Sequence, residues 1–426
     1  MKLSATVVSC ALFLALSPAA SAITWNVPTD APTIQAGIDS ASAGDTVIVS
    51  CGTYYEHDIV MKSGVTLRSE TGLPDCVTID ADSLGSVFYC QNVDSAATIE
   101  GFTITRGYKN EGGGLYLVNS SPAIRNCVVS GNGAVLGGGG LWLDMGSPTI
   151  TNCRLTGNSA IGGGGMCLSD CNSTISNCVV FDNSATWGGG GGLWLDDSSP
   201  TITGCTISGN SSWEGGGLSF CMGSLTLVNT IITFSSQGEA IYSSGGTPTL
   251  TCCDVYGNAG GDWTGCIAGQ DTVNNNLWAD PLFCEPESGD FSLRRDSPCA
   301  PDDSPAGCGL IGAEGVGCAL AAVAEPAVAP PTALTLGPAI PNPFNPVTGI
   351  IYGIPETDGP SRVTMNVYDA LGRRVTTLVD AEQSPGTYHV VWDGRDHKGG
   401  EVASGVYFYR ICWNGKSQTR RMVLLR

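Results

Sequence analysis

Residues 137–158 read GGGGLWLDMGSPTITNCRLTGN, and variants of this phrase recur along the chain. The glycine run of each copy leads into one apolar residue, and these residues are Leu115, Leu141, Met166, Leu193, Leu218 and Ile241. Successive copies are therefore 26, 25, 27, 25 and 23 residues apart. A period of this length is typical of a solenoid, in which residues one period apart become stacked neighbours. The repeat therefore predicts which side chains lie next to one another on the surface.

Each copy consists of short alternating runs separated by Gly, Asn and Ser-Pro bends. Leu141 and Leu143 flank Trp142 as in a half-buried strand, and Ile150 and Cys153 occupy apolar positions further along. Asn and Gly tolerate the left-handed backbone that such bends need. A leucine-rich repeat has a similar period, but it needs a helical convex side, where these copies carry Gly, Ser, Thr and Asn. We predict an all-β fold, a right-handed parallel β-helix with about three strands per coil.

The beginning of the chain indicates export. Met1-Lys2, an apolar run from Val7 to Leu16 and Ala20-Ser21-Ala22 are typical of a cleaved signal peptide, which we place at residues 1–22. No later run approaches 18 continuous apolar residues, so we predict no transmembrane span. Removal of residues 1–22 leaves 18 cysteines in an exported chain, where disulfides can form.

Composition divides the rest of the chain into three parts. We assign residues 23–318 to the β-helix, the Ala/Pro-rich residues 319–334 to a linker, and residues 335–426 to a small β-sandwich of alternating strands. In the β-helix, Ile34, Ile38 and Ala41 stand at helical spacing after Thr33. We expect a short helix there to cap the open end of the solenoid.

Charge is distributed unevenly between these parts. Residues 23–318 hold 30 acidic and 8 basic side chains, whereas residues 335–426 hold 8 acidic and 10 basic ones. So acidic a surface argues against DNA, RNA or anionic lipid as a partner. Neutral glycans, cations and basic proteins stay open as partners.

Three phrases near the start resemble a known family. TIQAGID at residues 33–39, AGDTVIV at 43–49 and GTYYE at 52–56 are similar to the N-terminal cap and first coil of the pectin-lyase-like β-helix superfamily. The resemblance covers about residues 27–270. It implies the fold and not a reaction, because that superfamily includes lyases, hydrolases, adhesins and proteins without enzymatic activity.

A second resemblance covers the end of the chain. PNPFNP at residues 341–346, YDALGR at 368–373, WDG at 392–394, ASGVY at 403–407 and RMVLLR at 421–426 resemble the Ig-like domain shared by flagellar hook-capping proteins and type IX secretion cargo. The sorting version implies interaction with secretion and outer-membrane machinery. It also implies a secreted, extracellular or outer-surface location. The alternative is a plain Ig-like spacer.

Catalytic residues of the superfamily have no clear counterparts in the repeats. By resemblance, pectin-cleaving members use calcium-binding aspartates with an arginine, or clustered aspartates with His and Arg-x-Lys. The β-helix region has one histidine, His57, and the repeats proper carry only Arg125 and Arg154 as basic residues. We predict no catalytic residue, no metal site and no cofactor, with calcium at the carboxylates as an alternative.

Four carboxylates follow the first strand of successive copies, namely Asp144, Asp170, Asp196 and Asp197. With coils about 4.8 Å apart, Asp144 and Asp196 would lie about 9–10 Å apart, near the limit for an inverting glycosidase. Aspartate after a strand is more often ordinary turn chemistry. A polysaccharide lyase or glycosidase is therefore the alternative function.

Aromatic residues form the second candidate site. The outward column beside Trp142 contains Tyr116, Trp194 and Tyr242, interrupted by Cys167 and Ser219. Trp187 and Trp213 precede glycine runs and are expected to stack one coil apart. Aromatic rings beside carboxylates suit pyranose rings. We therefore predict binding of an extracellular or surface glycan without cleavage, with a structural or adhesive role as a further alternative.

Threonines and cysteines form two more columns. Paired threonines such as Thr149 and Thr151 resemble the face of ice-binding β-helices, although Thr is common on strands. One inward position is expected to hold a packed column made of Phe102, Cys127, Cys153, Cys178, Cys205, Thr230 and Cys253. Disulfides are expected between Cys167 and Cys171, and among Cys266, Cys284, Cys299, Cys308 and Cys318.

Overall fold

The computed structural model describes residues 21–318, 333–340, 342–344, 346, 348–355 and 360–425. Almost all of the predicted signal peptide, residues 1–22, and of the predicted linker, residues 319–334, lies outside these ranges. The chain divides into two compact units, Met1–Leu320 and Ala321–Arg426, which are described separately below.

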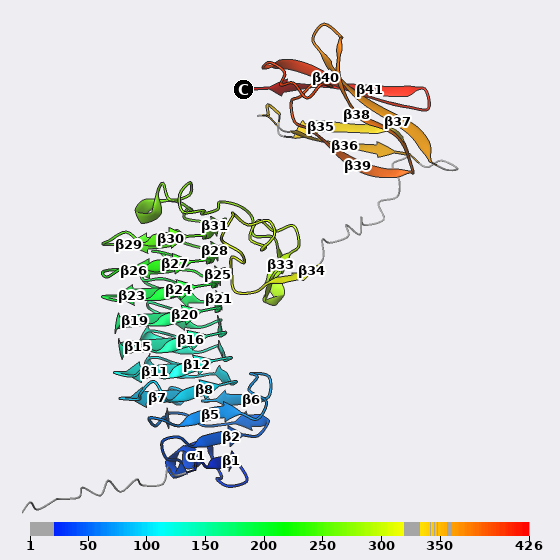
Figure 1. The fold of residues 1–426 in the computed structure, drawn as a ribbon. Helices are drawn as coiled ribbons and strands as arrows, with labels where there is room; N and C mark the ends of the chain where they lie inside the picture. The colour runs from blue at the N-terminus through cyan, green and yellow to red at the C-terminus, as the bar shows by residue number, and fades with distance from the viewer. Residues whose placement is uncertain are drawn as a thin grey trace, which may run out of the picture. The chain divides into compact units, whose positions relative to one another are not determined.

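Three long parallel sheets wind around the first unit as a β-helix (Figure 1). The first sheet contains β4 (Ile59–Val60), β7 (Phe88–Gln91), β11 (Leu115–Val118), β15 (Leu141–Gly146), β19 (Met166–Cys171), β23 (Leu193–Asp196), β26 (Leu218–Phe220) and β29 (Ile241–Ser243). The second contains β1 (Thr24–Val27), β2 (Thr46–Val49), β5 (Thr66–Ser69), β8 (Thr98–Glu100), β12 (Ala123–Arg125), β16 (Thr149–Thr151), β20 (Thr174–Ser176), β24 (Thr201–Thr203), β27 (Thr226–Val228) and β30 (Thr249–Thr251).

The third sheet completes each coil. It contains β3 (Gly52–Tyr54), β6 (Val77–Asp80), β9 (Thr103–Thr105), β13 (Val128–Ser130), β17 (Arg154–Thr156), β21 (Val179–Phe181), β25 (Thr206–Ser208), β28 (Ile231–Thr233) and β31 (Asp254–Tyr256). The predicted three-stranded coil is thus confirmed. Four coils add a short fourth ladder that the sequence analysis did not separate from the glycine runs, made of β10 (Tyr108–Glu111), β14 (Gly133–Gly137), β18 (Ser159–Ala160) and β22 (Ser184–Ala185).

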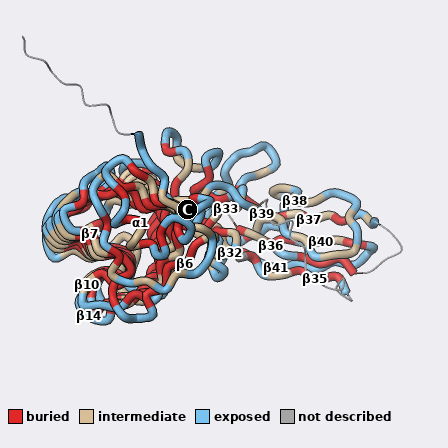
Figure 2. The backbone as a smooth tube through the Cα atoms, turned by 90° about the horizontal axis from the view of Figure 1, so that it is seen from below, coloured by how far each residue is buried: buried red, intermediate tan, exposed pale blue. Residues whose placement is uncertain are grey.

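The register of the first sheet is the one that the repeat predicts. Leu141 pairs with Leu115 on one side and with Met166 on the other, and the ladder continues through Leu193 and Leu218 to Ile241. A slip of one residue would turn every inward side chain toward solvent, so burial of one face fixes this register. Figure 2 looks along the coils and shows buried segments interspersed with intermediate and exposed ones around the wall.

The predicted cysteine column is buried in the core. Cys127, Cys153, Cys178, Cys205 and Cys253 are at most 1 % exposed and are not in disulfides. Burial raises the pKa of Cys253 to about 12, so this thiol stays protonated and packs as a small apolar group. Thr230 fits the same column because its Oγ1 accepts a hydrogen bond from Cys205 N (3.4 Å), as Cys205 Sγ does from Cys178 N (3.4 Å).

A ladder of buried asparagines closes the bend after the third sheet. It consists of Asn132, Asn158, Asn183 and Asn210, all at most 1 % exposed. Asn183 Oδ1 accepts hydrogen bonds from the backbone N and Nδ2 of Asn158, and Asn210 Oδ1 accepts the equivalent pair from Asn183 (all 3.0 Å). These side chains satisfy buried backbone groups that the strands leave unpaired at the bend.

The cap helix is present as expected. α1 (Ile34–Ser40) begins after Thr33, whose side chain accepts a hydrogen bond from Ala36 N, and it buries Ile34 and Ile38. The Glu56 carboxylate accepts hydrogen bonds from the backbone N of Ile34 and Gln35 (2.8 and 3.1 Å), which satisfies the first turn.

After β31 the chain turns back along the third sheet (Figure 1). Before this turn, η1 (Gly265–Ile267) lies beside β29 at the end of the first sheet. The returning segment contains β32 (Phe283–Glu285), η2 (Pro286–Ser288), β33 (Asp290–Arg294) and β34 (Val316–Cys318). Phe291 and Leu293 pack with Val179 and Ile231 of the wall in a second buried cluster. Arg154 anchors the segment by donating to the Glu314 carboxylate and the Gly289 carbonyl.

Three disulfides form, and they correct part of the prediction. They join Cys51 to Cys76, Cys252 to Cys308, and Cys284 to Cys318. Only the last pair lies wholly within the predicted group, from which Cys266 and Cys299 stay free. The expected bond between Cys167 and Cys171 is wrong: both thiols are free and buried on β19. Residues four apart in a strand are separated by about 13 Å, beyond the reach of a disulfide.

The second unit is a sandwich of two antiparallel sheets. One contains β35 (Thr335–Ile340), β36 (Thr348–Ile354) and β39 (Gly386–Trp392); the other contains β37 (Ser361–Asp369), β38 (Arg374–Gln383), β40 (Gly405–Trp413) and β41 (Lys416–Leu424). Trp392, Tyr352, Tyr409 and Met422 fill the space between them. The described parts of both units contain no helix long and apolar enough to cross a membrane.

Candidate functional site

The predicted aromatic column stands on the outer face of the first sheet, but it is half-buried. Trp142 pairs with Tyr116 and Cys167, and Trp194 pairs with Cys167 and Ser219. The glycine runs cover these rings: a Cβ added at Gly137 would lie 2.6 Å from Trp142 Cζ3, and one at Gly162 would lie 2.7 Å from Trp194 Cε3. Backbone without a side chain is therefore needed there.

Two other indoles are open to solvent. Trp187 is 83 % exposed and Trp213 is 72 % exposed. Together with Gly188 and Glu214 they line a cavity of about 570 Å³. A single exposed apolar residue is normal on a protein surface, but two tryptophans at one cavity mark a candidate binding site.

A second cavity of about 230 Å³ shares Trp187, Gly188 and Glu214 with the first. Its wall also includes Trp194, Asp196 and Tyr242. We call this combined surface the tryptophan site and define it by Trp187, Trp194, Asp196, Trp213, Glu214 and Tyr242. Five of these six were predicted as ligand-binding residues, and the structure brings them together.

The loop before β23 positions the site. Gly188 and Gly189 have φ angles of 53° and 74°, in the left-handed region that glycine adopts without strain. A Cβ at Gly189 would lie 3.1 Å from Trp194 Cδ2, so the loop passes directly over that indole. Ser212 Oγ donates a hydrogen bond to Gly189 O (2.8 Å), and this bond ties the loops of two neighbouring coils together.

Glu214 lies across this loop. Its backbone N donates to Ser212 Oγ (3.4 Å), and its Oε2 would lie 3.3 Å from a Cβ at Gly188. Glu214 was not among the residues predicted from the sequence. Its position directly after Trp213 is the only signal in the sequence.

The four predicted aspartates divide into two kinds. Asp144 and Asp196 both align with Ser169 in the first sheet, so they stand two coils apart on one face, as expected. Asp170, near the end of β19, and Asp197, directly after β23, have φ angles of 48° and 45° and are exposed. They occupy the left-handed bend that asparagine and aspartate tolerate, which is a structural role.

Charge at this face is concentrated and uncompensated. Burial raises the pKa of Asp144, with additional repulsion from Asp170 and Glu111. Burial also raises the pKa of Glu239, to which repulsion from Glu214 adds. Burial is the main cause of both shifts, and repulsion between neighbouring carboxylates adds to it.

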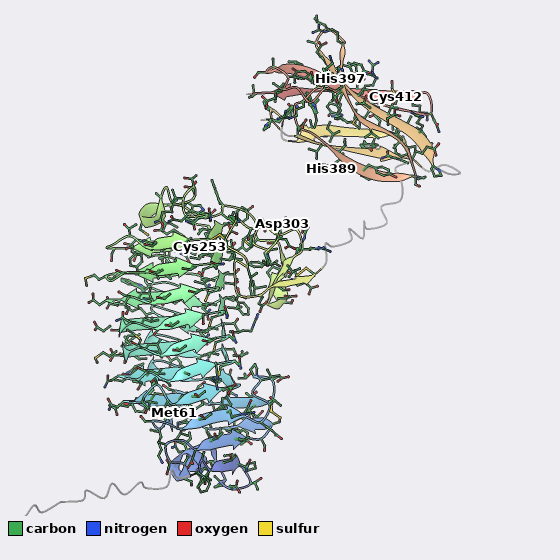
Figure 3. The ribbon with its side chains drawn as sticks, in the orientation of Figure 1. Met61, Cys253, Asp303, His389, His397 and Cys412 are labelled. Atoms are coloured by element: carbon green, nitrogen blue, oxygen red, sulfur yellow. A yellow bond between two sulfur atoms is a disulfide. The ribbon has the colours of Figure 1, made fainter. Side chains whose placement is uncertain are left out.

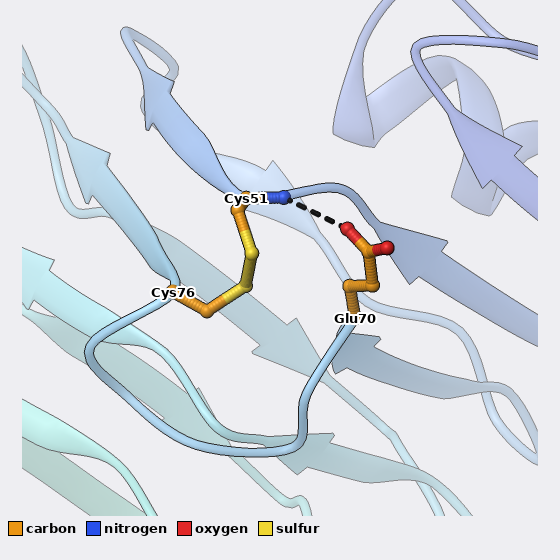
Figure 4. Close-up of side chains that lie close together, drawn as sticks. All are labelled: Cys51, Glu70 and Cys76. Carbon is orange, nitrogen blue, oxygen red and sulfur yellow. Dashed lines mark hydrogen bonds between the residues drawn. A yellow bond between two sulfur atoms is a disulfide. The ribbon is translucent and has the colours of Figure 1, made fainter.

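One group of potential metal ligands elsewhere in the described residues is excluded as a metal site. Cys51, Glu70 and Cys76 offer atoms within 4.8 Å of one another. However, the two sulfurs are bonded to each other, and Glu70 Oε2 accepts a hydrogen bond from Cys51 N at 3.3 Å (Figure 4). A disulfide sulfur is not a thiolate ligand, so this trio is structural.

The histidines do not contribute to the tryptophan site. His389 and His397 lie in the sandwich unit (Figure 3), and His57 Nδ1 contacts the Asp58 carboxylate at 3.2 Å. The exposed threonines of the second sheet, among them Thr149, Thr174 and Thr201, form a separate ladder.

Comparisons with known proteins agree with this architecture. Residues 86–277 match the family described as right handed beta helix region, and residues 355–412 match the family described as FlgD Ig-like domain. The chain therefore consists of a right-handed β-helix region followed by a C-terminal FlgD Ig-like domain. A comparison with curated proteins finds no match.

Two solved structures are similar over a small part of the chain. Dimeric latent PorU from Porphyromonas gingivalis is 19 % identical, with 22 % of this chain and 9 % of that chain covered and a TM-score of 0.20. PorZ, an essential surface component of the type-IX secretion system of the same organism, is 26 % identical, with 22 % and 11 % covered and a TM-score of 0.16. The chain thus spans about a tenth of the length of either protein.

Proposed function

We propose that this chain, a β-helix region joined to an FlgD Ig-like domain, is an exported protein that binds a glycan at the tryptophan site without cleaving it. The observation that carries the proposal is the pair of exposed indoles, Trp187 and Trp213, at one cavity with Glu214. Apolar faces of pyranose rings stack on indoles, and carboxylates accept hydrogen bonds from sugar hydroxyls. The neighbouring cavity beside Trp194 and Tyr242 offers room for a second sugar unit.

The chain lacks basic residues where a lyase would need them. Between Arg154 and Arg294 the sequence contains no Lys or Arg, and the tryptophan site lies wholly within this stretch. A lyase acting on uronates needs positive charge to neutralise the substrate carboxylate and a base to remove a proton. Binding without β-elimination is therefore the function that the site supports.

A glycosidase is the second candidate, since Asp196 and Glu214 line one cavity. Hydrolysis requires two carboxyl groups about 5–9.5 Å apart on either side of the bond that breaks.

A neutral-glycan array probed with the full chain is expected to give binding. A reducing-end assay on each bound glycan is expected to show no release of product. Product that disappears in Asp196→Asn would establish the glycosidase instead.

Export through the C-terminal domain is the second part of the proposal. The resemblance to sorting domains, the predicted signal peptide and the three disulfides all favour an extracytoplasmic location. We expect a chain lacking residues 335–426 to accumulate in the periplasm, measured by cell fractionation and surface proteolysis. The β-helix is a separate compact unit, so the truncation leaves its core intact. Surface display of the truncated chain at the normal level would refute the sorting role.

A further inference from the structure

The stretch of chain that holds the tryptophan site is strongly anionic. Residues 155–293 contain 13 Asp and Glu side chains and no Lys or Arg. Ion pairs that neutralise carboxylates elsewhere, such as Arg125 with Glu100 and Arg154 with Glu314, lie outside the site. A ligand that enters the cavities therefore meets a negative potential with no basic side chain of these coils to offset it.

The local contacts place this charge next to the indoles. Glu214 is exposed, and its carboxylate reaches over the backbone of Gly188, directly after Trp187. Repulsion between Glu214 and Glu239 contributes to the raised pKa of Glu239, so a second carboxylate lies nearby. Asp196 lines the adjoining cavity. Aromatic faces combined with carboxylates are the composition that recognises ammonium groups.

We propose that the tryptophan site binds a polymer of glucosamine units through their protonated amino groups, held against the faces of Trp187 and Trp213 with Glu214 as the counter-ion. This inference rests on the proposed function, because it names the class of glycan that the site takes. An N-acetylated polymer keeps the stacking on the indoles but loses the cationic contact. A uronate polymer is repelled by the same carboxylates.

The magnitude of the preference follows from two exposed interactions. A cation–π contact at an exposed indole and an exposed ion pair each strengthen binding by up to about fivefold. Together they correspond to a roughly tenfold preference for the amino form over the N-acetylated form. The two adjoining cavities favour a polymer over a free amine, because neighbouring units occupy both.

The test is a set of calorimetric titrations of the full chain at about pH 5.5, where carboxylates of ordinary pKa are ionised. The probes are a glucosamine hexamer, its fully N-acetylated form, a galacturonate hexamer and hexalysine. We expect the glucosamine hexamer to bind roughly tenfold more tightly than the N-acetylated hexamer, and the other two probes to bind more weakly than either. Glu214→Gln removes the ion pair but leaves the cation–π contacts, so it is expected to reduce this difference to roughly threefold, whereas loss of a hydroxyl contact would weaken both hexamers alike.

A matched control and three outcomes make the test decisive. Glu287→Gln removes one charge at an exposed position on η2, outside both cavities, and should leave every affinity unchanged. Equal binding of the two glucosamine hexamers overturns the inference while glycan binding stands. Hexalysine binding as tightly as the glucosamine hexamer overturns it in favour of ammonium recognition without a sugar. Binding of neither hexamer overturns it as well, and the proposed function is then decided by the array alone.

Discussion

Asn183→Ala is expected to destabilise the β-helix by about 4 kcal/mol. Asn183 Nδ2 donates hydrogen bonds to Leu155 O (2.9 Å), Phe181 O (3.0 Å) and Asn210 Oδ1 (3.0 Å), and its Oδ1 accepts two more from Asn158. The side chain is 1 % exposed. Its removal leaves several buried donors and acceptors without a partner, and each unsatisfied group costs about 1–3 kcal/mol.

The measurement is the urea dependence of circular dichroism for the wild type and the variant. Asn172→Ala is the control, because Asn172 is exposed and accepts a single hydrogen bond from Ser199 N (2.9 Å). We expect the control to lose no more than about 1 kcal/mol. Equal loss in the two variants would mean that the buried ladder contributes nothing beyond an ordinary exposed hydrogen bond.

Asp254→Asn is expected to stabilise the protein at neutral and higher pH by as much as about 4 kcal/mol. Asp254 is fully buried on β31, and burial raises its pKa to about 7, with repulsion from Asp262 and Asp280 in the same direction. Asparagine keeps the acceptor for Ala279 N (3.1 Å) and meets the Cys299 thiol with an amide instead of a carboxylate. The neutral isostere avoids the cost of a buried charge.

The stability gained by Asp254→Asn is expected to increase with pH. The folded protein holds a proton on Asp254 that the unfolded chain releases near pH 4, so wild-type stability falls as pH rises from about 4 to about 7 and then levels off. The variant lacks this decline. Thermal midpoints of both proteins, measured across this range, are expected to coincide near pH 4 and to separate above it. A gap that is constant with pH would contradict the assignment.

Most of the fold could be predicted from the sequence because each coil repeats the same environment. The apolar positions of the copies fix the register, and the structure pairs Leu141 with Leu115 and Met166 as the alignment requires. The cap helix could be predicted from Thr33 and the spacing of Ile34 and Ile38. Local patterns of this kind determine local structure wherever one face must be buried.

The disulfide pairs were harder to predict from the sequence, because pairing depends on which side of a bend each cysteine occupies. Cys252 has a φ of 52° at a bend where other coils place an asparagine, such as Asn152 and Asn177, so its side chain leaves the wall and reaches Cys308. Cys253, the next residue, enters the buried column. A comparison of this Cys-Cys pair with the Asn-Cys of other copies could have separated the two roles.

The candidate site was only partly visible in the sequence. Alternation correctly put Trp142 and Trp194 on the outer face, but it could not show that backbone from the glycine runs covers them. Loop residues have no such periodic constraint, so the convergence of Trp187, Trp213 and Glu214 on one cavity required three-dimensional structure. The binding surface consequently moves from the strand face to the loops that border it.

Glycan binding at the tryptophan site is tested by calorimetric titration of the best-bound glycan into wild type and a Trp187→Ala/Trp213→Ala double variant. Loss of two stacking faces, at about 1.5 kcal/mol each, is expected to weaken binding roughly a hundredfold. Trp278→Ala is the matched control, because that indole is 65 % exposed and lies outside both cavities, with its Nε1 donating to Asp262. The control is expected to bind as the wild type does. A double variant with wild-type affinity would contradict binding at the tryptophan site.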